Sequence, residues 1–115
     1  GLQVDVNDNI YVAGYTDNDL GGENNGDYDA WVAKYDSNGN QIWIEQFGTS
    51  DYDTATAISA DTNGHIYVSG FTEGSLGATN AGSYDSWIVK LDANDGTVDS
   101  FTGNIPLYSS SPEFS

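Results

Sequence analysis

Short runs of apolar residues separated by clusters of Gly, Asn and Asp divide the chain into segments of strand length. Hydrophobic side chains occupy both faces of these segments, and no stretch has the 3.6-residue periodicity of a helix. The pattern therefore predicts an all-β chain. The expected strands are Leu2–Val4, Ile10–Thr16, Asp29–Tyr35, Gln41–Phe47, Thr54–Ala60, Ile66–Thr72, Asp85–Leu91 and Thr97–Phe101.

The strand pattern of the first half of the chain is repeated in the second half. A shift of 56 residues aligns 43 residues of the two halves without a gap, and 17 of these 43 pairs are identical. Asn9–Thr16 then aligns with His65–Thr72, and Tyr28–Asp36 aligns with Tyr84–Asp92. A regularity of this kind predicts two copies of one structural unit.

The expected turns share an Asp-x-Asn motif. An Asp side chain can accept a hydrogen bond from the backbone two residues further on, and Asn and Gly tolerate the left-handed conformation of tight hairpins. Four of the acidic residues thus have a structural role. They are Asp5, Asp36, Asp61 and Asp92.

Four antiparallel strands in a unit of about 55 residues, the first of them rich in small residues, are typical of a β-propeller blade. The segments Asn9–Thr16, Gly64–Thr72, Tyr28–Asp36 and Trp43–Gly48 resemble the bacterial β-propeller repeats known as SBBP repeats. This resemblance covers residues 1 to about 103. It implies a tandem array in a large secreted or surface-exposed bacterial protein, and it implies little about activity.

We expect propeller blade 1 at residues 1–48, with a truncated first strand, and blade 2 at residues 49–103. Residues 104–115 contain both prolines and are predicted to be a linker or the start of a further segment. Because propellers have about four to eight blades, two blades predict part of a larger propeller or of an oligomer. Asp99 aligns with Trp43, so the fourth strand of blade 2 is degenerate and this blade is expected near an end of the array.

Charge and composition exclude several classes of function. The chain has 18 acidic and 2 basic residues and a net charge of −16, so Lys34 and Lys90 are too few to hold a phosphate backbone. It has no apolar run near the ~20 residues of a membrane-spanning helix, so membrane insertion is not expected. Without cysteine it can form no disulfide, zinc finger or thiol nucleophile.

No catalytic group is expected in this sequence. His65 is the single histidine, aligns with Asn9 in a turn, and belongs to no Ser-His-Asp arrangement. The glycines lack the patterns of phosphate-binding loops. The prediction is that the chain is not an enzyme and carries no cofactor, with calcium as the one candidate ion.

A calcium site is one interpretation of the acidic loop that follows the second strand. Asp17, Asp19, Asp27 and Asp29 are the candidate ligands, because Ca²⁺ prefers carboxylate oxygens. Three of the five carboxylates of this loop are absent from the second copy, which favours the alternative of turn chemistry and a solubilising acidic surface.

The aromatic residues separate into core and surface candidates. Tyr28 and Tyr84 lie where a loop meets a strand, and Tyr52 lies in the turn between the units, so these three are candidates for stacking on sugar rings. The aromatic pairs predicted to pack between blades are Tyr11 and Tyr67, Trp31 and Trp87, and Tyr15 and Phe71.

The sequence thus favours a non-catalytic scaffold for protein interaction or assembly. Its loops at 17–27 and 73–83 vary between the copies while the strands do not, and recognition commonly resides in loops on a rigid scaffold. Expected partners are other blades of the same protein, further copies of the chain, or another surface protein or glycan. A carbohydrate-binding propeller and a calcium-dependent adhesin module are the alternatives.

Overall fold

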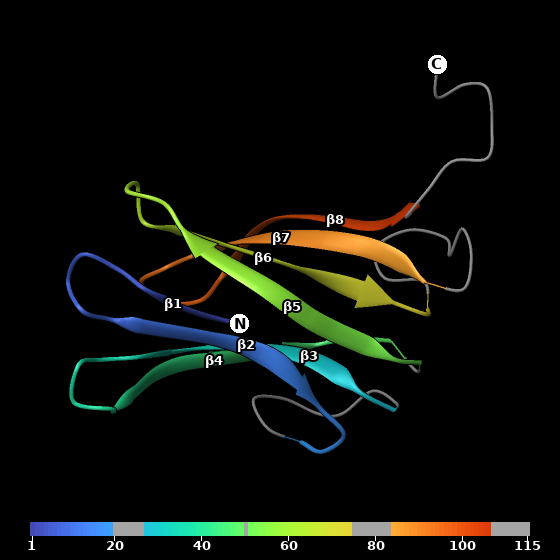
Figure 1. The fold of residues 1–115 in the computed structure, drawn as a ribbon, viewed down its shortest axis with the longest axis horizontal. Helices are drawn as coiled ribbons and strands as arrows, with labels where there is room; N and C mark the ends of the chain where they lie inside the picture. Colours follow the sequence, from blue (N-terminus) through green and yellow to red (C-terminus); the bar gives the residue numbers. More distant parts are fainter. Residues whose placement is uncertain (20–26, 50, 75–83, 107–115) are drawn as a thin grey trace.

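The computed structural model describes residues 1–19, 27–49, 51–74 and 84–106 (Figure 1). They form two four-stranded antiparallel sheets, each with its strands in chain order, which confirms the all-β prediction. The first sheet contains β1 (Leu2–Val4), β2 (Ile10–Thr16), β3 (Asp29–Tyr35) and β4 (Gln41–Phe47), and the second contains β5 (Asp53–Ala60), β6 (His65–Thr72), β7 (Asp85–Asp92) and β8 (Val98–Pro106). The described part of the chain contains no helix long and apolar enough to cross a membrane.

The strand bounds agree with the sequence pattern to within one residue except in β8. This strand has nine residues and extends past residue 103, where the second unit was expected to end. Its backbone pairs with β7 as far as Pro106, with two irregularities in the register. Because β8 is an edge strand, a proline at its end interrupts no ladder and does not end the pairing earlier.

The alignment of Asp99 with Trp43 is wrong. In the first sheet Trp43 lies opposite Lys34, whereas in the second sheet Ser100 lies opposite Lys90. The reason is the last turn, which closes between Asp92 N and the carbonyl of Thr97, one residue further on than the corresponding turn of the first unit. A serine, rather than an aspartate, therefore occupies the position of the tryptophan.

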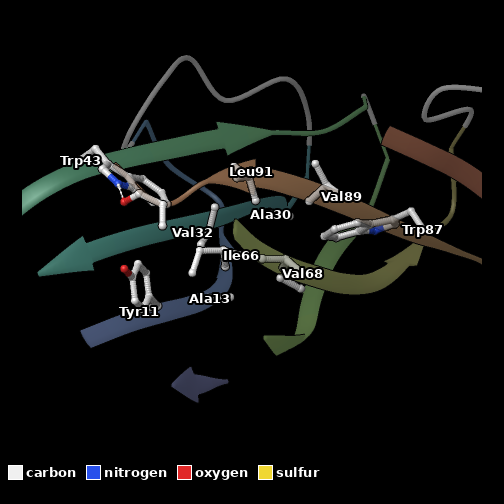
Figure 2. Close-up of a cluster of buried hydrophobic side chains, with 12 residues drawn as sticks. Tyr11, Ala13, Ala30, Val32, Trp43, Ile66, Val68, Trp87, Val89 and Leu91 are labelled. Carbon is white, nitrogen blue, oxygen red and sulfur yellow. Dashed lines mark hydrogen bonds between the residues drawn. The ribbon is translucent and has the colours of Figure 1, made fainter. Parts of the chain in front are cut away.

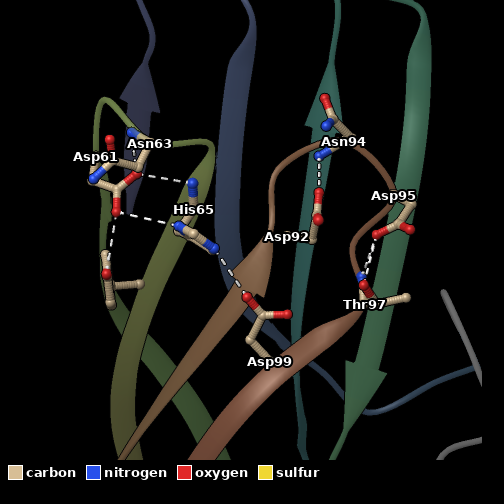
Figure 3. Close-up of polar contacts among 9 residues, drawn as sticks. Asp61, Asn63, His65, Asp92, Asn94, Asp95, Thr97 and Asp99 are labelled. Carbon is tan, nitrogen blue, oxygen red and sulfur yellow. Dashed lines mark hydrogen bonds and ion pairs between the residues drawn. The ribbon is translucent and has the colours of Figure 1, made fainter.

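The Asp-x-Asn turns form as their sequence predicts (Figure 3). In the turn at Asp36, Oδ1 accepts hydrogen bonds from the amides of Asn38 and Asn40, both at 2.9 Å. These bonds to the charged carboxylate, that of Asn40 foremost, lower the pKa of Asp36. The fourth residue of this turn, Gly39, has a φ of 85°, and Asp8 occupies the corresponding position of the first turn with a φ of 64°.

The two sheets pack face to face around one core (Figure 2). One face of the first sheet meets β5, β6 and β7 of the second, and apolar side chains of both sheets interlock there. In this core the centroid of the Trp87 ring lies 5.2 Å from that of Phe47 in the first sheet and 6.3 Å from that of Phe101 in β8. The buried side chains labelled in Figure 2 are Tyr11, Ala13, Ala30, Val32, Trp43, Ile66, Val68, Trp87, Val89 and Leu91.

A single carbonyl group anchors one sheet to the other. The carbonyl oxygen of Ala93, in the turn between β7 and β8, accepts hydrogen bonds from Lys34 Nζ at 2.8 Å and Trp43 Nε1 at 3.0 Å. Both donors are buried. The same turn lays Gly96 against the Trp43 ring. We call this contact the Ala93 anchor.

Burial separates the aromatic residues differently from the sequence prediction. Tyr11 and Trp87 are core residues, each 1% exposed. Tyr15 and Phe71, by contrast, are 55% and 39% exposed, so neither belongs to the core between these two sheets. Tyr15 is next to the last residue of β2 and contacts surface rings, and Phe71 lies on the face of the second sheet that points away from the first. Trp31 is half-buried on the outward face of the first sheet.

Substitution of Gly96 tests the Ala93 anchor. Gly96→Ala places a methyl group 2.7 Å from the Trp43 ring at a φ of 79°, so both the ring and the backbone must shift. Gly39→Ala is the matched control, because Gly39 has a φ of 85° and open space around it. In urea unfolding we expect Gly39→Ala to cost about 1–2 kcal/mol and Gly96→Ala about 1–3 kcal/mol more. Equal losses of unfolding free energy in the two variants would contradict a tight contact between Gly96 and the Trp43 ring.

The turn at Asp8 is expected to tolerate a glycine better than the native residue. Asp8→Gly relieves a non-glycine side chain at a positive φ, and the greater freedom of glycine in the unfolded chain offsets part of this gain. We expect a net increase of about 0.5 kcal/mol in the free energy of unfolding. Asp8→Ala removes the same charge but keeps a Cβ at the positive φ, and an equal gain from it would assign the effect to charge.

Candidate functional site

Seven strands have an end at one end of the molecule, which we call the loop end. β2, β4, β6 and β8 finish there, and β3, β5 and β7 begin there, as the strand pairing requires. A bond from the amide of Asp53 to the carbonyl of Tyr28, at 2.8 Å, joins the two sheets at this end. All the residues singled out in the sequence as calcium or sugar ligands lie at this end.

A buried carboxylate, Asp53, organises the connection between the sheets. It is fully buried and accepts hydrogen bonds from the amide of Thr49 at 2.5 Å and from the hydroxyl of Thr72 at 2.5 Å. Burial raises the pKa of Asp53 despite these bonds, and the nearby charge of Asp29 acts in the same direction. Gly48 lies between the two carboxylates, where a side chain would overlap both.

The structure divides the four candidate calcium ligands into two groups. Asp17, Asp19 and Asp27 are exposed, whereas Asp29 is buried at the start of β3 and accepts a long hydrogen bond of 3.4 Å from Gln46 Nε2. Within the described residues no three Asp, Glu or His side chains are grouped so that they could hold a metal ion. Calcium binding stays a prediction.

The three candidate sugar-binding tyrosines meet at the loop end, together with a fourth. The rings of Tyr28 and Tyr52 have centroids 5.3 Å apart, and Tyr15 packs edge-on against Tyr28, also at 5.3 Å. Tyr84 hydrogen-bonds Glu73, and this bond raises the pKa of the Tyr84 hydroxyl. The amide of Glu73 in turn donates to the carbonyl of Tyr52 at 2.9 Å. We call Tyr15, Tyr28, Tyr52 and Tyr84 the tyrosine cluster.

Sequence reasoning missed Tyr15 as a member of this cluster. The repeat aligned it with Phe71 on a strand, which suggested a packed ring. Its place next to the last residue of β2, two residues before the exposed Asp17, is the signal that could have identified it as a surface residue.

The single histidine lies at the opposite end and is enclosed by carboxylates (Figure 3). His65 Nε2 is 3.0 Å from Asp99 Oδ2, and Nδ1 is 3.6 Å from Asp61 Oδ2. The Tyr67 hydroxyl donates to the same Asp61 oxygen at 3.1 Å. Both ring nitrogens therefore face carboxylates.

A cleft of about 480 Å³ lies near this histidine, between the β1–β2 and β5–β6 turns. Its two carboxylates, Asp5 and Asp61, each accept a hydrogen bond from an amide of their own turn, and Asp5 Oδ2 also accepts the Tyr11 hydroxyl at 2.8 Å. Burial of Asp5 opposes ionisation, but hydrogen bonds from Asn9 and Tyr11 outweigh it and lower the pKa of Asp5. The carboxylates that line the cleft therefore already have hydrogen-bond partners within the chain.

The second sheet repeats, on its outward face, the surface that the first sheet buries. Tyr11 lies opposite Lys34 in the first sheet, with the ammonium 5.6 Å from the ring centroid. Tyr67 lies opposite Lys90 in the second sheet, where the same distance is 5.9 Å. The neighbouring apolar residue is buried in the first sheet as Val32, with 0% exposure, and uncovered in the second as Ile88, with 42% exposure. We call the outward face of the second sheet, with Tyr67, Phe71, Ile88 and Lys90, open face 2.

The outward face of the first sheet repeats the surface that the second sheet buries. Trp87 is 1% exposed in the core, whereas its counterpart Trp31 is half-buried. Leu2, Val4 and Ile42 share the face of Trp31 and are 65%, 47% and 48% exposed. We call this surface open face 1.

A segment of the chain is similar to a known family of repeats. Residues 42–78 match the model of the family described as SBBP, Beta-propeller repeat. The matched segment begins in β4 and continues past β6, so it bridges the two sheets. The match confirms the resemblance to SBBP repeats inferred from the sequence.

One curated relative is the regulatory protein FlaEY of Caulobacter vibrioides. The two chains are 33% identical over 72 residues, which represent 59% of this chain. This chain spans only about 7% of the length of that relative.

The raised pKa of Asp53 predicts a specific dependence of stability on pH. Since the folded state holds this proton more tightly than the unfolded chain, stability falls as pH rises from about 3.8 through the pKa of the folded state. Asp53→Asn removes this portion of the pH profile, measured as the difference in free energy of unfolding from the native chain. Asp36→Asn is the control of opposite sign, because its lowered pKa confers stability that is lost as pH falls below 3.8. A flat difference curve for Asp53→Asn would contradict the prediction.

Proposed function

We propose that the chain is a non-catalytic scaffold module of a secreted or cell-surface bacterial protein, whose two open faces stack on further units of the same kind. Open face 1 receives the open face 2 of a preceding unit, and open face 2 receives the open face 1 of a following unit. Each added unit repeats the contact already present within the chain. The product is a ring or a longer array of blades.

The observation that carries this proposal is the equal register of the two sheets. The pairs Tyr11–Lys34 and Tyr67–Lys90 occupy the same place in each sheet, one pair at the seam between the sheets and the other on open face 2. Lys34 donates to a carbonyl of the facing turn. Lys90, half-buried over its own tyrosine, is the matching donor for the turn of a following unit.

Exposed apolar area supports the same proposal. Ile88, Phe71, Leu2 and Ile42 lie on the two open faces with exposures between 39% and 65%. Large uncovered apolar patches on soluble proteins commonly mark interaction surfaces. The two faces differ from each other, so the stacking is head-to-tail, and such contacts extend or close into rings rather than stop at a dimer.

Two observations support a role without catalysis and within a larger protein. The imidazole of His65 is enclosed by Asp61 and Asp99 and is not available as a general base. In FlaEY, named a regulatory protein, the segment similar to this chain is a small part of a much longer protein. A structural module within a longer polypeptide fits both observations.

Two further functions agree with the sequence and are separable by experiment. Carbohydrate binding would use the tyrosine cluster and is one arm of the experiment described below for that site. A calcium-dependent adhesin would lose thermal stability on addition of EDTA, by mass action.

An open-face variant tests the stacking proposal. We expect the native chain to associate with rising concentration in light scattering, and Ile88→Asp to shift it toward the monomer, because the charge cannot be buried in a stacked seam. Val6→Asp is the matched control, since Val6 lies in a turn, is 92% exposed and receives the same charge. Thermal unfolding checks that each variant folds.

The contrary outcomes are distinct. A native chain that stays monomeric over the whole concentration range, or Ile88→Asp and Val6→Asp variants with equal association, would exclude open face 2 as the stacking surface.

A further inference from the structure

We propose that the tyrosine cluster, together with Glu73, is a binding site for an organic ammonium group. The site lies at the loop end, where both sheets contribute rings. It is separate from the two open faces, so it goes beyond the stacking role.

The geometry supplies several aromatic surfaces at one place. The planes of Tyr15 and Tyr28 are 86° apart and those of Tyr28 and Tyr52 are 32° apart, so three rings in contact present faces in different directions. Tyr15 and Tyr52 are 55% and 43% exposed, and Tyr84 is 52% exposed. Surfaces of several aromatic rings at an angle are the arrangement that holds substituted ammonium groups by cation–π attraction.

Hydrogen bonds hold these rings in place. The amide of Asp53 bonds the carbonyl of Tyr28, and the amide of Glu73 bonds the carbonyl of Tyr52. Glu73 also hydrogen-bonds Tyr84, which connects the fourth ring with the other three. The backbone at Tyr28 and Tyr52 and the side chain of Tyr84 are therefore held before a ligand arrives, and this limits the entropy lost on binding.

Charge decides which ligand the rings attract. Three of the four rings have an exposed carboxylate within two residues in the sequence, namely Asp17 near Tyr15, Asp27 next to Tyr28 and Asp51 next to Tyr52. The lysines are elsewhere: Lys34 is buried at the Ala93 anchor and Lys90 lies on open face 2. A cation thus gains both ring contact and attraction to a chain of net charge −16, whereas a neutral sugar gains ring contact alone.

A pair of ligands with the same shape, one charged and one neutral, separates the effect of charge from that of ring contact. Choline and its uncharged isostere 3,3-dimethylbutan-1-ol are titrated into the protein by calorimetry, with cellobiose as the carbohydrate probe. We expect choline to bind more tightly than the isostere. Tyr52→Ala is expected to weaken choline binding about three- to tenfold, and Tyr52→Phe to retain it, because the ring face is kept.

The role of Glu73 needs a control for overall charge. Glu73→Gln is expected to weaken choline binding about threefold or more. Asp36→Asn removes the same charge from a turn at the opposite end of the sheets and is expected to leave the affinity unchanged. Thermal unfolding confirms that each variant folds.

Several outcomes would overturn the proposal. Equal binding of choline and its isostere would show that charge does not matter, and equal losses in Glu73→Gln and Asp36→Asn would assign the binding to diffuse acidity. Cellobiose binding that is lost in Tyr52→Ala, without choline binding, would make the cluster a carbohydrate site. Since neither ligand contacts an open face, loss of the ammonium site leaves the association behaviour of the chain intact.

Discussion

The rest of the structure depends on one carbonyl group, that of Ala93. Lys34 and Trp43 would each leave a buried donor without a partner if the β7–β8 turn lay elsewhere, and such a donor costs about 1–3 kcal/mol or more. Both are satisfied by the same oxygen, so the turn of the second sheet is fixed on the first sheet at a single point. Gly96 is required there, because any side chain would enter the space of the Trp43 ring.

The same contact explains why the two sheets are alike and yet not equivalent. The first sheet has both donors, whereas the second has Lys90 with Ser100 in the place of the tryptophan. A following unit would therefore find a lysine but no indole on open face 2. The missing ring removes one hydrogen bond and a large apolar contact, so a contact at this face is weaker than the seam within the chain.

Local features of the chain were predictable, and features set by the sheet-to-sheet contact were not. The strands and the Asp-x-Asn turns follow from apolar runs and turn residues, which act over a few positions. The exposure of Tyr15 was indicated only by its place near the end of a strand, because it depends on where the facing sheet ends. The pairing of Ser100 with Lys90 escaped notice because a one-residue difference in turn length leaves the rest of the alignment unchanged. The two carboxylates around Gly48 come from different sheets, so no spacing in the sequence announces them.

The loop end owes its chemistry to the seam between the sheets. Tyr15 and Tyr28 belong to the first unit and Tyr52 to the second, so the contact between Tyr28 and Tyr52 exists only while the sheets are docked. Asp53 holds this end together through Thr49 and Thr72, and it does so as a buried carboxylate whose raised pKa disfavours its own charge. The Ala93 anchor fixes the docking of the two sheets at the end opposite the loop end. The same docking must keep Asp53 buried at the loop end, although burial disfavours its charge. The aromatic surface is then a product of the stacking itself, and each further seam that brings equivalent rings together would create another.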